Sequence, residues 1–401
     1  MKKLNKVNNY RGFSLAWVIG IVVITSIISA ITAGVIVYNN NKLSYDTTYG
    51  DLSNDEDLNE FLSVYANILS NYYEDVDTGA LLDEAIAGMM DYLGDDYTTY
   101  LDDESTAELF ESLSGEYNGI GVSINNSDKS IVKVYSNTPA SKAGIQEGDI
   151  IVGFNDTDVT NMTATEVVNL IKNSNDYFTL KLQRGTETIS VSLKNETLIA
   201  PNIEYYMVEN TNIGYLYLQT FSNTLATQVE NALNELENNG MSSLIIDLRN
   251  NTGGYLTAAT DVASIFLEKG ERIYSLSYQN DVTNFNDETN EHKDYKIVVL
   301  INENTASASE ILAAALKQSY GATIVGETSF GKGKVQQTMQ LDDGSMVKYT
   351  SAYWLTPNGT CIDGTGINPD YYIVNEEVTD EEGNITIPDA QLNRAIEVLQ
   401  E

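Results

Sequence analysis

A serine and a lysine at two consecutive strand ends are the residues best placed for nucleophilic catalysis. Ser307 follows the apolar run 297–301, which predicts a buried strand, and lies in the segment 306–316, whose composition favours a helix. Backbone N–H groups at a helix N-terminus are free and point outward, so the N–H of Ala308 is placed to stabilise an oxyanion. This pattern predicts a serine nucleophile at the start of a helix.

The base that activates Ser307 is expected to be a lysine. The 401-residue chain holds one histidine, His292, in a charged segment with no other sign of a site, which disfavours a Ser-His-Asp arrangement. Lys332 lies 25 positions after Ser307 (332 − 307), between two glycines that allow close backbone approach. Burial there would lower its pKa and supply a neutral amine. If Lys332 begins a strand, the side chain of Gln336 shares its face and can orient the amine.

Simpler interpretations of these residues stay open. Ser307 with Glu310 three positions later is also the pattern of a capping box. Lys332 also fits a solvated lysine in a turn, and Lys334 competes with it for the role of base.

Two segments resemble the carboxy-terminal processing (tail-specific) peptidases. Thr-Ala-Ser-Ala-Ser-Glu-Ile at 305–311 is similar to the family's Ser-Ala-Ser-Ala-Ser run, with threonine in first place. Phe-Gly-Lys-Gly-Lys-Val-Gln at 330–336 is similar to its Phe-Gly-Lys-Gly element. The resemblance implies a dyad with Ser307 as nucleophile and Lys332 as general base, and it implies that Gln336 orients the lysine.

The same resemblance places the second oxyanion donor in segment 247–254. This segment is similar to the family's Asp-Leu-Arg-x-Asn-Pro-Gly-Gly motif, with Thr252 where proline is usual. Gly253 and Gly254 are both candidates for the donor N–H. The alternative is a strand-to-helix turn that needs glycine for a positive φ, and both interpretations can hold together.

Strands, helices and glycine stops alternate in the second half of the chain, which predicts a parallel sheet with right-handed crossovers. The expected strands are 212–221, 243–248, 297–301 and 323–326, and the expected helices are 223–239, 255–267 and 306–316. A hairpin is expected over 335–341 and 346–354. The resemblance implies a Clp-protease/crotonase-like α/β catalytic domain over 198–375, followed by a helical extension over 376–401.

Short strands and glycine turns occupy residues 111–197, a region similar to a circularly permuted PDZ domain. The similarity depends on Pro139-Ala140, on the element at 148–151 and on a helix over 164–172. In such a domain, successive N–H groups bind a peptide's terminal carboxylate and the adjacent strand pairs with the peptide. Here those groups belong to Gly119, Ile120, Gly121 and Val122. A PDZ domain that only packs on the catalytic domain is the alternative.

The amino-terminal region predicts a membrane anchor. Residues 1–12 are basic and predicted to be cytoplasmic, and the almost wholly apolar run 15–37 is, at 23 residues, long enough to cross a bilayer. We expect a signal anchor over 13–38 and a stalk over 39–56. A cleaved signal peptide is the alternative. A helical region is expected over 57–110, with helices at 58–70 and 81–93.

The charge and composition of the chain disfavour several classes of partner and cofactor. The net charge of −36 argues against nucleic acid, and one cysteine with one histidine excludes a disulfide framework and a zinc site, so we expect no metal and no cofactor. An acidic cluster is expected to be a solvated loop, with a calcium site as the less favoured interpretation. The cluster consists of Asp95, Asp96, Asp102, Asp103 and Glu104.

The sequence therefore predicts a membrane-anchored, extracytoplasmic serine endopeptidase. Its substrates are expected to be proteins and peptides with accessible C-termini, recognised by the PDZ domain. The alternatives are an inert PDZ adaptor on a protease scaffold and a crotonase-like acyl-CoA enzyme. Helices 58–93 and 389–399 either pair between two subunits of a homodimer or cover their own domain.

Overall fold

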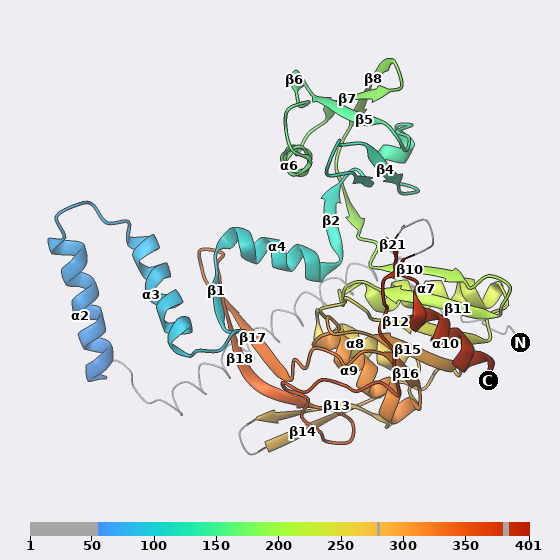
Figure 1. The fold of residues 1–401 in the computed structure, drawn as a ribbon. Coiled ribbons are helices and arrows are strands. Elements are labelled where there is room, and N and C mark those ends of the chain that lie inside the picture. The colour runs from blue at the N-terminus through green and yellow to red at the C-terminus, as the bar shows by residue number, and fades with distance from the viewer. Residues whose placement is uncertain (1–54, 279–280, 380–384) are drawn as a thin grey trace, which may run out of the picture. The chain divides into compact units, whose positions relative to one another are not determined.

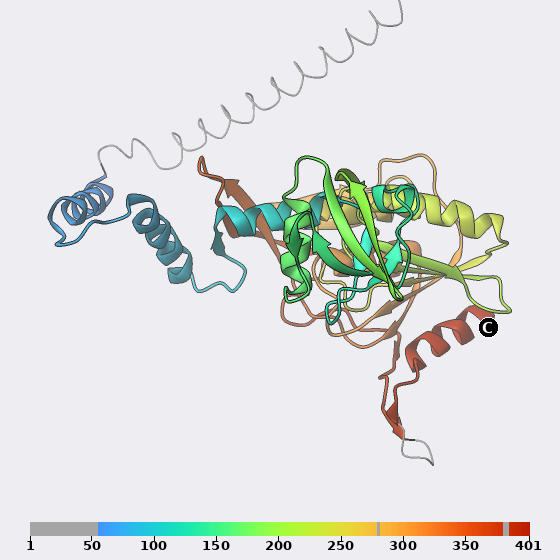
Figure 2. The same ribbon diagram turned by 90° about the horizontal axis from the view of Figure 1, so that it is seen from above.

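The computed structural model describes residues 55–278, 281–379 and 385–401 (Figures 1 and 2). The predicted cytoplasmic tail, signal anchor and most of the stalk lie outside these residues. Among the residues described, no helix has the length and apolarity needed to span a bilayer. The chain divides into two compact units, residues 1–85 and 86–401.

Two helices follow the stalk, as the sequence predicted. Helix α2 spans Glu56–Asn71 and α3 spans Thr78–Tyr92. Asp55 caps α2 by accepting a hydrogen bond from the N–H of Leu58. Several large apolar side chains on these helices are exposed: Leu58, Phe61, Leu62, Val64, Ile68, Leu82 and Met89. Whether they meet a second copy of the chain stays a prediction.

The acidic cluster is exposed except at Asp95, as expected, but it does not form one loop, and that part of the expectation was wrong. Strand β1, Thr99–Leu101, and helix α4, Asp103–Ser114, form there instead. Asp102 caps α4 by accepting from the N–H of Ser105, and two further acids lie in the first turn, where the helix dipole favours negative charge. Asp95 is half-buried and ion-paired. Among the described residues no acidic cluster has the geometry of a metal site.

The region predicted as a PDZ domain forms a small β-structure with its own apolar core. Its main sheet has the order β6-β5-β7-β8, β3 pairs with β4, and β2 pairs with β9. Helix α6 spans Ala164–Lys172, as predicted. The other elements are β2 Glu116–Gly119, β3 Val122–Ile124, β4 Ile131–Val134, α5 Pro139–Lys142, β5 Ile150–Phe154, β6 Thr157–Asp158, β7 Phe178–Arg184, β8 Glu187–Leu193 and β9 Glu196–Ile199.

A six-stranded sheet in the order β10-β11-β12-β15-β16-β19 supports the catalytic residues (Figure 1). All neighbours are parallel except the edge pair β10 and β11, so the predicted parallel sheet is confirmed. Helices α7, α8 and α9 share one core with the sheet, and α10 packs in another. The bounds are β10 Ile203–Met207, β11 Ile213–Leu218, α7 Leu225–Asn238, β12 Ser243–Asp247, α8 Leu256–Ser264, β15 Lys296–Ile301, α9 Ala308–Ala315, β16 Thr323–Gly326, β19 Tyr371–Tyr372 and α10 Ala390–Gln400.

A second sheet pairs distant parts of the chain. The predicted hairpin forms as β17, Lys334–Gln340, and β18, Met346–Leu355. Strand β18 also pairs with β1 and with β13 (Arg272–Tyr278), which pairs with β14 (Asp281–Asn286); the sequence reasoning missed β1, β13 and β14. After α9 the chain makes a π-helical turn, Leu316–Tyr320, that ends at Gly321 with φ 93°. A short ribbon, β20 Val378–Thr379 and β21 Ile385–Thr386, precedes α10.

Candidate active site

Ser307 occupies a strained turn between β15 and α9. Its φ is 58° and its ψ is −120°, whereas an ordinary helix-capping residue has β-region angles. A non-glycine residue in such a sparsely populated region is costly and persists only where its surroundings impose it. Strand-to-helix turns of this kind expose a nucleophile. The structure thus places Ser307 in an unusual backbone conformation at the carboxyl edge of the sheet.

A buried carboxylate connects Ser307 with the loop that holds Lys332. Glu310 Oε2 accepts from the N–H of Ser307 at 2.8 Å and from the N–H of Lys332 at 2.9 Å. Because these two nitrogens bond the same oxygen, they lie at most 5.7 Å apart. Glu310 Oε1 accepts from Ser329 Oγ and from the N–H of Gly331. Burial raises the pKa of this carboxyl, and its hydrogen bonds oppose that rise.

The backbone around Lys332 is confined on both sides. A Cβ at Gly331 would lie 2.8 Å from the N of Gly366, and one at Gly333 would lie 2.7 Å from Asp363, so only glycine fits. Trp354 Nε1 donates to the carbonyl of Lys332 at 2.8 Å. Burial, followed by the charge of Lys348, lowers the pKa of the Lys332 amine. A lysine with a lowered pKa is the kind that serves as a base.

The amine of Lys332 lies against an aromatic ring rather than against the serine hydroxyl. Its Nζ is 4.6 Å from the centroid of the Tyr97 ring. Within the described part of the chain, no hydrogen bond joins this amine to Ser307 Oγ or to Gln336. The Gln336 amide instead donates to Thr350 Oγ1 at 3.4 Å.

The predicted pairing of Lys332 and Gln336 on one strand face was wrong. Strand β17 begins at Lys334 rather than at Lys332, and its register against β18 shifts between Val335 and Gln336. The physical reason is that the chain at Gly333 bonds to β18 in a separate way, through the N–H of Trp354. The role of Gln336 stays a prediction.

The structure separates Lys332 from its competitor Lys334. Lys334 Nζ forms an ion pair with Asp95 Oδ1 at 2.7 Å, and this bond raises the pKa of Lys334. Burial opposes ionisation of Asp95, but the bonds from Lys334 and from two threonine hydroxyls lower its pKa to about 2. Lys334 is therefore held as a charged partner, and the lysine favoured as neutral base is Lys332.

The two candidate oxyanion glycines differ in what their N–H groups do. The N–H of Gly253 donates to Asn251 Oδ1 at 2.9 Å. Among the described residues, no hydrogen bond uses the N–H of Gly254 or that of Ala308. A Cβ at Gly253 would lie 2.9 Å from Ser307 Cβ and 3.0 Å from the N of Ala308, so this turn packs directly on the serine. The geometry favours Gly254 as the donor and Gly253 as the close contact.

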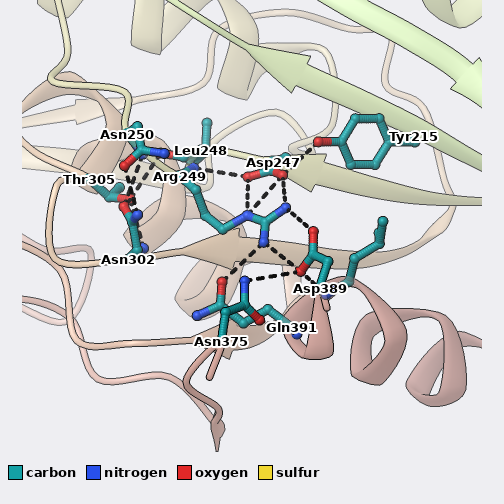
Figure 3. Close-up of polar contacts among 11 residues, drawn as sticks. Tyr215, Asp247, Leu248, Arg249, Asn250, Asn302, Thr305, Asn375, Asp389 and Gln391 are labelled. Atoms are coloured by element: carbon teal, nitrogen blue, oxygen red, sulfur yellow. Dashed lines mark hydrogen bonds and ion pairs between the residues drawn. The ribbon is translucent and has the colours of Figure 1, made fainter. Parts of the chain in front are cut away.

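A buried ion-pair network fixes the turn that contains these glycines to the carboxy-terminal helix (Figure 3). Arg249, near the end of β12, bonds Asp247 at 2.6 Å and Asp389, the N-cap of α10, at 2.7 Å. Burial would raise the pKa of Asp389, but the bonds from Arg249 and from the N–H of Leu392 outweigh it and lower the pKa. Tyr215 also donates to Asp247 at 2.6 Å. The Asp-Leu-Arg part of the motif thus has a structural role.

The predicted carboxylate loop of the PDZ region borders a small groove against α6. Gly119, Ile120, Gly121 and Val122 line this groove together with Val168, Ile171 and Lys172. Gly121 has φ 82°, and a Cβ there would lie 2.3 Å from Thr138. Within the described residues, no hydrogen bond uses the N–H groups of Ile120 and Gly121. Both are free for a ligand, and tail binding by this loop stays a prediction.

His292 lies away from these groups. It lines a pocket with Phe266, Tyr320 and Val398, and that pocket contains neither Ser307 nor Lys332. The sequence reasoning considered Glu310 only as a capping residue and did not single out Tyr97 or Trp354. Glu310 had a detectable signal, because it lies three residues after a serine. Nothing in the sequence indicated that Tyr97 would meet Lys332, because the fold alone brings the two together.

Comparisons with known proteins agree across the chain. The sequence models of peptidase family S41, of the PDZ domain and of the activating protease CtpB N-terminal domain match residues 212–373, 108–183 and 29–105. Carboxy-terminal processing protease CtpA of Bacillus subtilis (strain 168) is 36% identical over 354 residues, 87% of this chain and 75% of that protein. A probable CtpA-like serine protease of Staphylococcus aureus (strain COL) is 35% identical over 361 residues, 88% and 71% of the two chains.

Among solved structures, the photosystem II D1 C-terminal processing protease is similar, with 27% identity, 87% of this chain and 95% of that chain covered, and a TM-score of 0.48. The assignment rests on the sequence relatives, which extend over most of both chains. The chain therefore belongs to peptidase family S41 and is a carboxy-terminal processing serine peptidase with a PDZ domain.

Proposed function

We propose that this protein is a membrane-anchored endopeptidase that acts outside the cytoplasmic membrane and cleaves proteins with a Ser307–Lys332 dyad. The observation that supports the dyad most directly is the shared carboxylate oxygen. Glu310 Oε2 bonds the backbone nitrogens of both residues and thereby holds the nucleophile and the base next to each other. Gln336 is proposed to orient the lysine once the amine turns toward the serine.

Acylation begins when neutral Lys332 takes the proton of Ser307 Oγ as this oxygen attacks the scissile carbonyl carbon. The N–H groups of Ala308 and Gly254 then donate to the negatively charged oxygen of the tetrahedral intermediate. The intermediate collapses to an ester on Ser307 as Lys332 gives its proton to the leaving nitrogen. The amine must move from the Tyr97 ring to the hydroxyl, a rearrangement that unliganded enzymes commonly require.

Deacylation uses the same two side chains. Lys332, neutral again, takes a proton from a water molecule that attacks the ester carbon. The second tetrahedral intermediate releases the carboxylic acid product, and the proton on Lys332 returns to Ser307 Oγ. No cofactor or metal enters these steps, since the lysine handles every proton.

The PDZ domain is proposed to bind the substrate's C-terminal tail. The support is the groove between the Gly119–Val122 loop and α6, with unused N–H groups at Ile120 and Gly121. An extended tail adds a strand at such an edge while its terminal carboxylate meets the loop.

The membrane location is proposed from the sequence. The apolar run 15–37 follows a basic tail, and without the four basic residues of 1–12 the chain's net charge falls from −36 to −40. Digestion of intact cells by an added protease would test this location. An extracytoplasmic domain is digested without cell lysis, and protection of the domain until lysis would contradict the proposal.

The dyad is tested with Ser307→Ala and Lys332→Ala in the full chain, using an unstructured peptide substrate and a serine-reactive fluorophosphonate probe. We expect both variants to fold and to lose cleavage, and the probe to label the wild type but not Ser307→Ala. A variant that cleaves at the wild-type rate would contradict the assignment. An unlabelled wild type that still binds C-terminal peptides would indicate an inert adaptor.

A further inference from the structure

Tyr97 places an aromatic ring beside the amine of the proposed base. It lies just before β1, and 235 positions (332 − 97) separate it from Lys332, whose Nζ is 4.6 Å from the ring centroid. A cation within about 6 Å of an aromatic centroid is attracted by the quadrupole of the ring. The ring is therefore the group that meets the lysine amine in this structure.

The segment that contains Tyr97 is fixed by its own contacts. Asp95 Oδ2 accepts from Thr98 Oγ1 at 2.7 Å and from Thr350 Oγ1 at 2.5 Å. The N–H of Thr350 donates to Thr98 Oγ1 at 3.1 Å, and β1 then pairs with β18 (Figure 1). The ring is thus held by an antiparallel strand pair and a side-chain network, and Lys332 meets it in a defined place.

The charges around Lys332 leave the ring as its direct partner. Lys334 forms an ion pair with Asp95, and its Nζ lies farther from the centroid of the Tyr97 ring, at 5.6 Å. Glu310, from α9, already accepts four hydrogen bonds, and Lys348, from β18, repels a second ammonium. The negative charge of Asp363 contributes to raising the pKa of Tyr97 and the pKa of Lys334. A ring face attracts the ammonium more weakly than a carboxylate does, so it steadies the amine without preventing release of the proton.

We propose that Tyr97 is a positioning residue for the general base, because its ring face holds the Lys332 amine while that amine is protonated. The proposal rests on the proposed Ser307–Lys332 dyad. In the unliganded enzyme the ring holds the ammonium, and the amine leaves the ring for the Ser307 hydroxyl once it has lost its proton. The hydroxyl of Tyr97 has no part in this role.

The test is the pH dependence of kcat/KM for peptide cleavage by the full chain. Loss of the ring in Tyr97→Leu removes a contact that favours the ammonium, so the acidic limb should move down by about half to one pH unit. We expect kcat to fall about tenfold with KM nearly unchanged, since the ring acts on the base and not on the substrate. Tyr97→Phe keeps the ring face and should keep the wild-type limb.

Tyr349→Leu is the matched control, because Tyr349 lies on β18 and donates to Gln337 rather than facing a lysine. If Tyr97→Leu melts early, Tyr97→Met has the same expected shift. The proposal would be overturned if the acidic limb of the pH profile stays in place or moves up in Tyr97→Leu and Tyr97→Met. It would also be overturned if the limb of Tyr97→Phe shifts as that of Tyr97→Leu does. Cleavage by Lys332→Ala would instead contradict the dyad. An inactive Lys332→Ala with an unmoved Tyr97→Leu limb would contradict only the role of Tyr97.

Discussion

The nucleophile and the base of this peptidase are positioned by different parts of the chain. Ser307 is placed by the strand before it, by the helix that holds Glu310 and by the 251–253 turn that packs against it. Lys332 is placed by distant residues: Trp354 on β18 fixes its carbonyl and Tyr97 faces its amine. The nucleophile therefore depends on neighbouring strands of one sheet and the turns that follow them, whereas the base depends on the assembly of two sheets.

Glu310 contacts both the turn that holds the nucleophile and the loop that holds the base. Glu310 caps the turn of Ser307 and also accepts from the N–H groups of Gly331 and Lys332. This buried carboxylate accepts four hydrogen bonds. Its position is fixed, because loss of any one bond leaves a buried N–H or hydroxyl without a partner. A substitution at Glu310 is therefore expected to disturb both Ser307 and Lys332. A substitution beside only one of these residues is expected to disturb that residue alone.

Glu310→Gln is expected to have the largest effect. An amide keeps the shape but turns an NH₂ group toward backbone donors, which leaves at least one of them unpaired. The free energy of unfolding should fall by about 3 kcal/mol, since bonds to a buried charged group are lost. Cleavage should fall more than 100-fold because both catalytic residues move. Urea unfolding and peptide cleavage measure the two effects.

Glu166→Gln in the PDZ region is the control for this change. Glu166 forms a capping box with Thr163 on an exposed helix start, so the same substitution there removes a similar motif without burial. We expect little change in stability and none in cleavage of a short peptide. Equal effects of the two substitutions would show that Glu310 is only a helix cap.

Gly253→Ala should act on the nucleophile half alone. The new Cβ would lie 2.9 Å from Ser307 Cβ and 3.0 Å from the N of Ala308, so the serine turn must shift. We expect kcat to fall about 100-fold, as for loss of an oxyanion donor. The acidic limb of the pH profile should stay in place because Lys332 is untouched.

Gly270→Ala separates this packing effect from backbone strain. Gly270 has φ 94°, close to the 106° of Gly253, but a Cβ there meets nothing within 4 Å. Both alanines should cost about 1–2 kcal/mol of stability for their positive φ. A catalytic loss of similar size in Gly270→Ala would refute the contact between Gly253 and the serine turn.

The contrast between the halves explains what the sequence could predict. The elements around Ser307 were predicted correctly, because periodicity and glycine stops act over a few residues. They are the strand at 297–301, the helix after Ser307 and the helix end at Gly321. The hairpin of β17 and β18 was also predicted. The sequence did not indicate that β1 would pair with β18, since nothing local specifies a partner so far along the chain.

The same limit explains the errors at the base. A strand start at Lys332 was expected from spacing, but the bond from the N–H of Trp354 to Gly333 sets a separate turn before β17. The acids at 95 and 102 were treated as one solvated cluster. The fold buries Asp95 against Lys334 and uses Asp102 as a helix cap. Short motifs thus indicated which residues take part, and tertiary pairing sets the direction in which their pKa values shift.

Asp95→Asn tests the ion pair between Asp95 and Lys334 beside the proposed base. The pKa of Asp95 falls from 3.8 to about 2, which limits its contribution to about 2.5 kcal/mol, or roughly 1–2 kcal/mol after solvent screening. A lowered folded-state pKa stabilises above pH 3.8, and this stabilisation disappears as the pH falls through about 2. Urea unfolding should therefore separate wild type from Asp95→Asn at pH 7 and bring them together near pH 2. A constant difference would contradict the ion pair with Lys334.

Lys332→Met should have the smallest effect on stability and the opposite sign. Burial lowers the pKa of Lys332, so between the folded and unfolded pKa values the unfolded chain binds more protons and stability rises with pH. Below its unfolded-state pKa the wild type bears a cost for burying this amine, whereas methionine fills the same space and contacts the Tyr97 ring through its sulfur. The variant should be about 1 kcal/mol more stable at pH 7, although inactive, and the gain should vanish as the pH approaches 10.5. Thermal unfolding at both pH values measures the gain, and a variant less stable than wild type at pH 7 would show that the lysine is placed for stability rather than for catalysis.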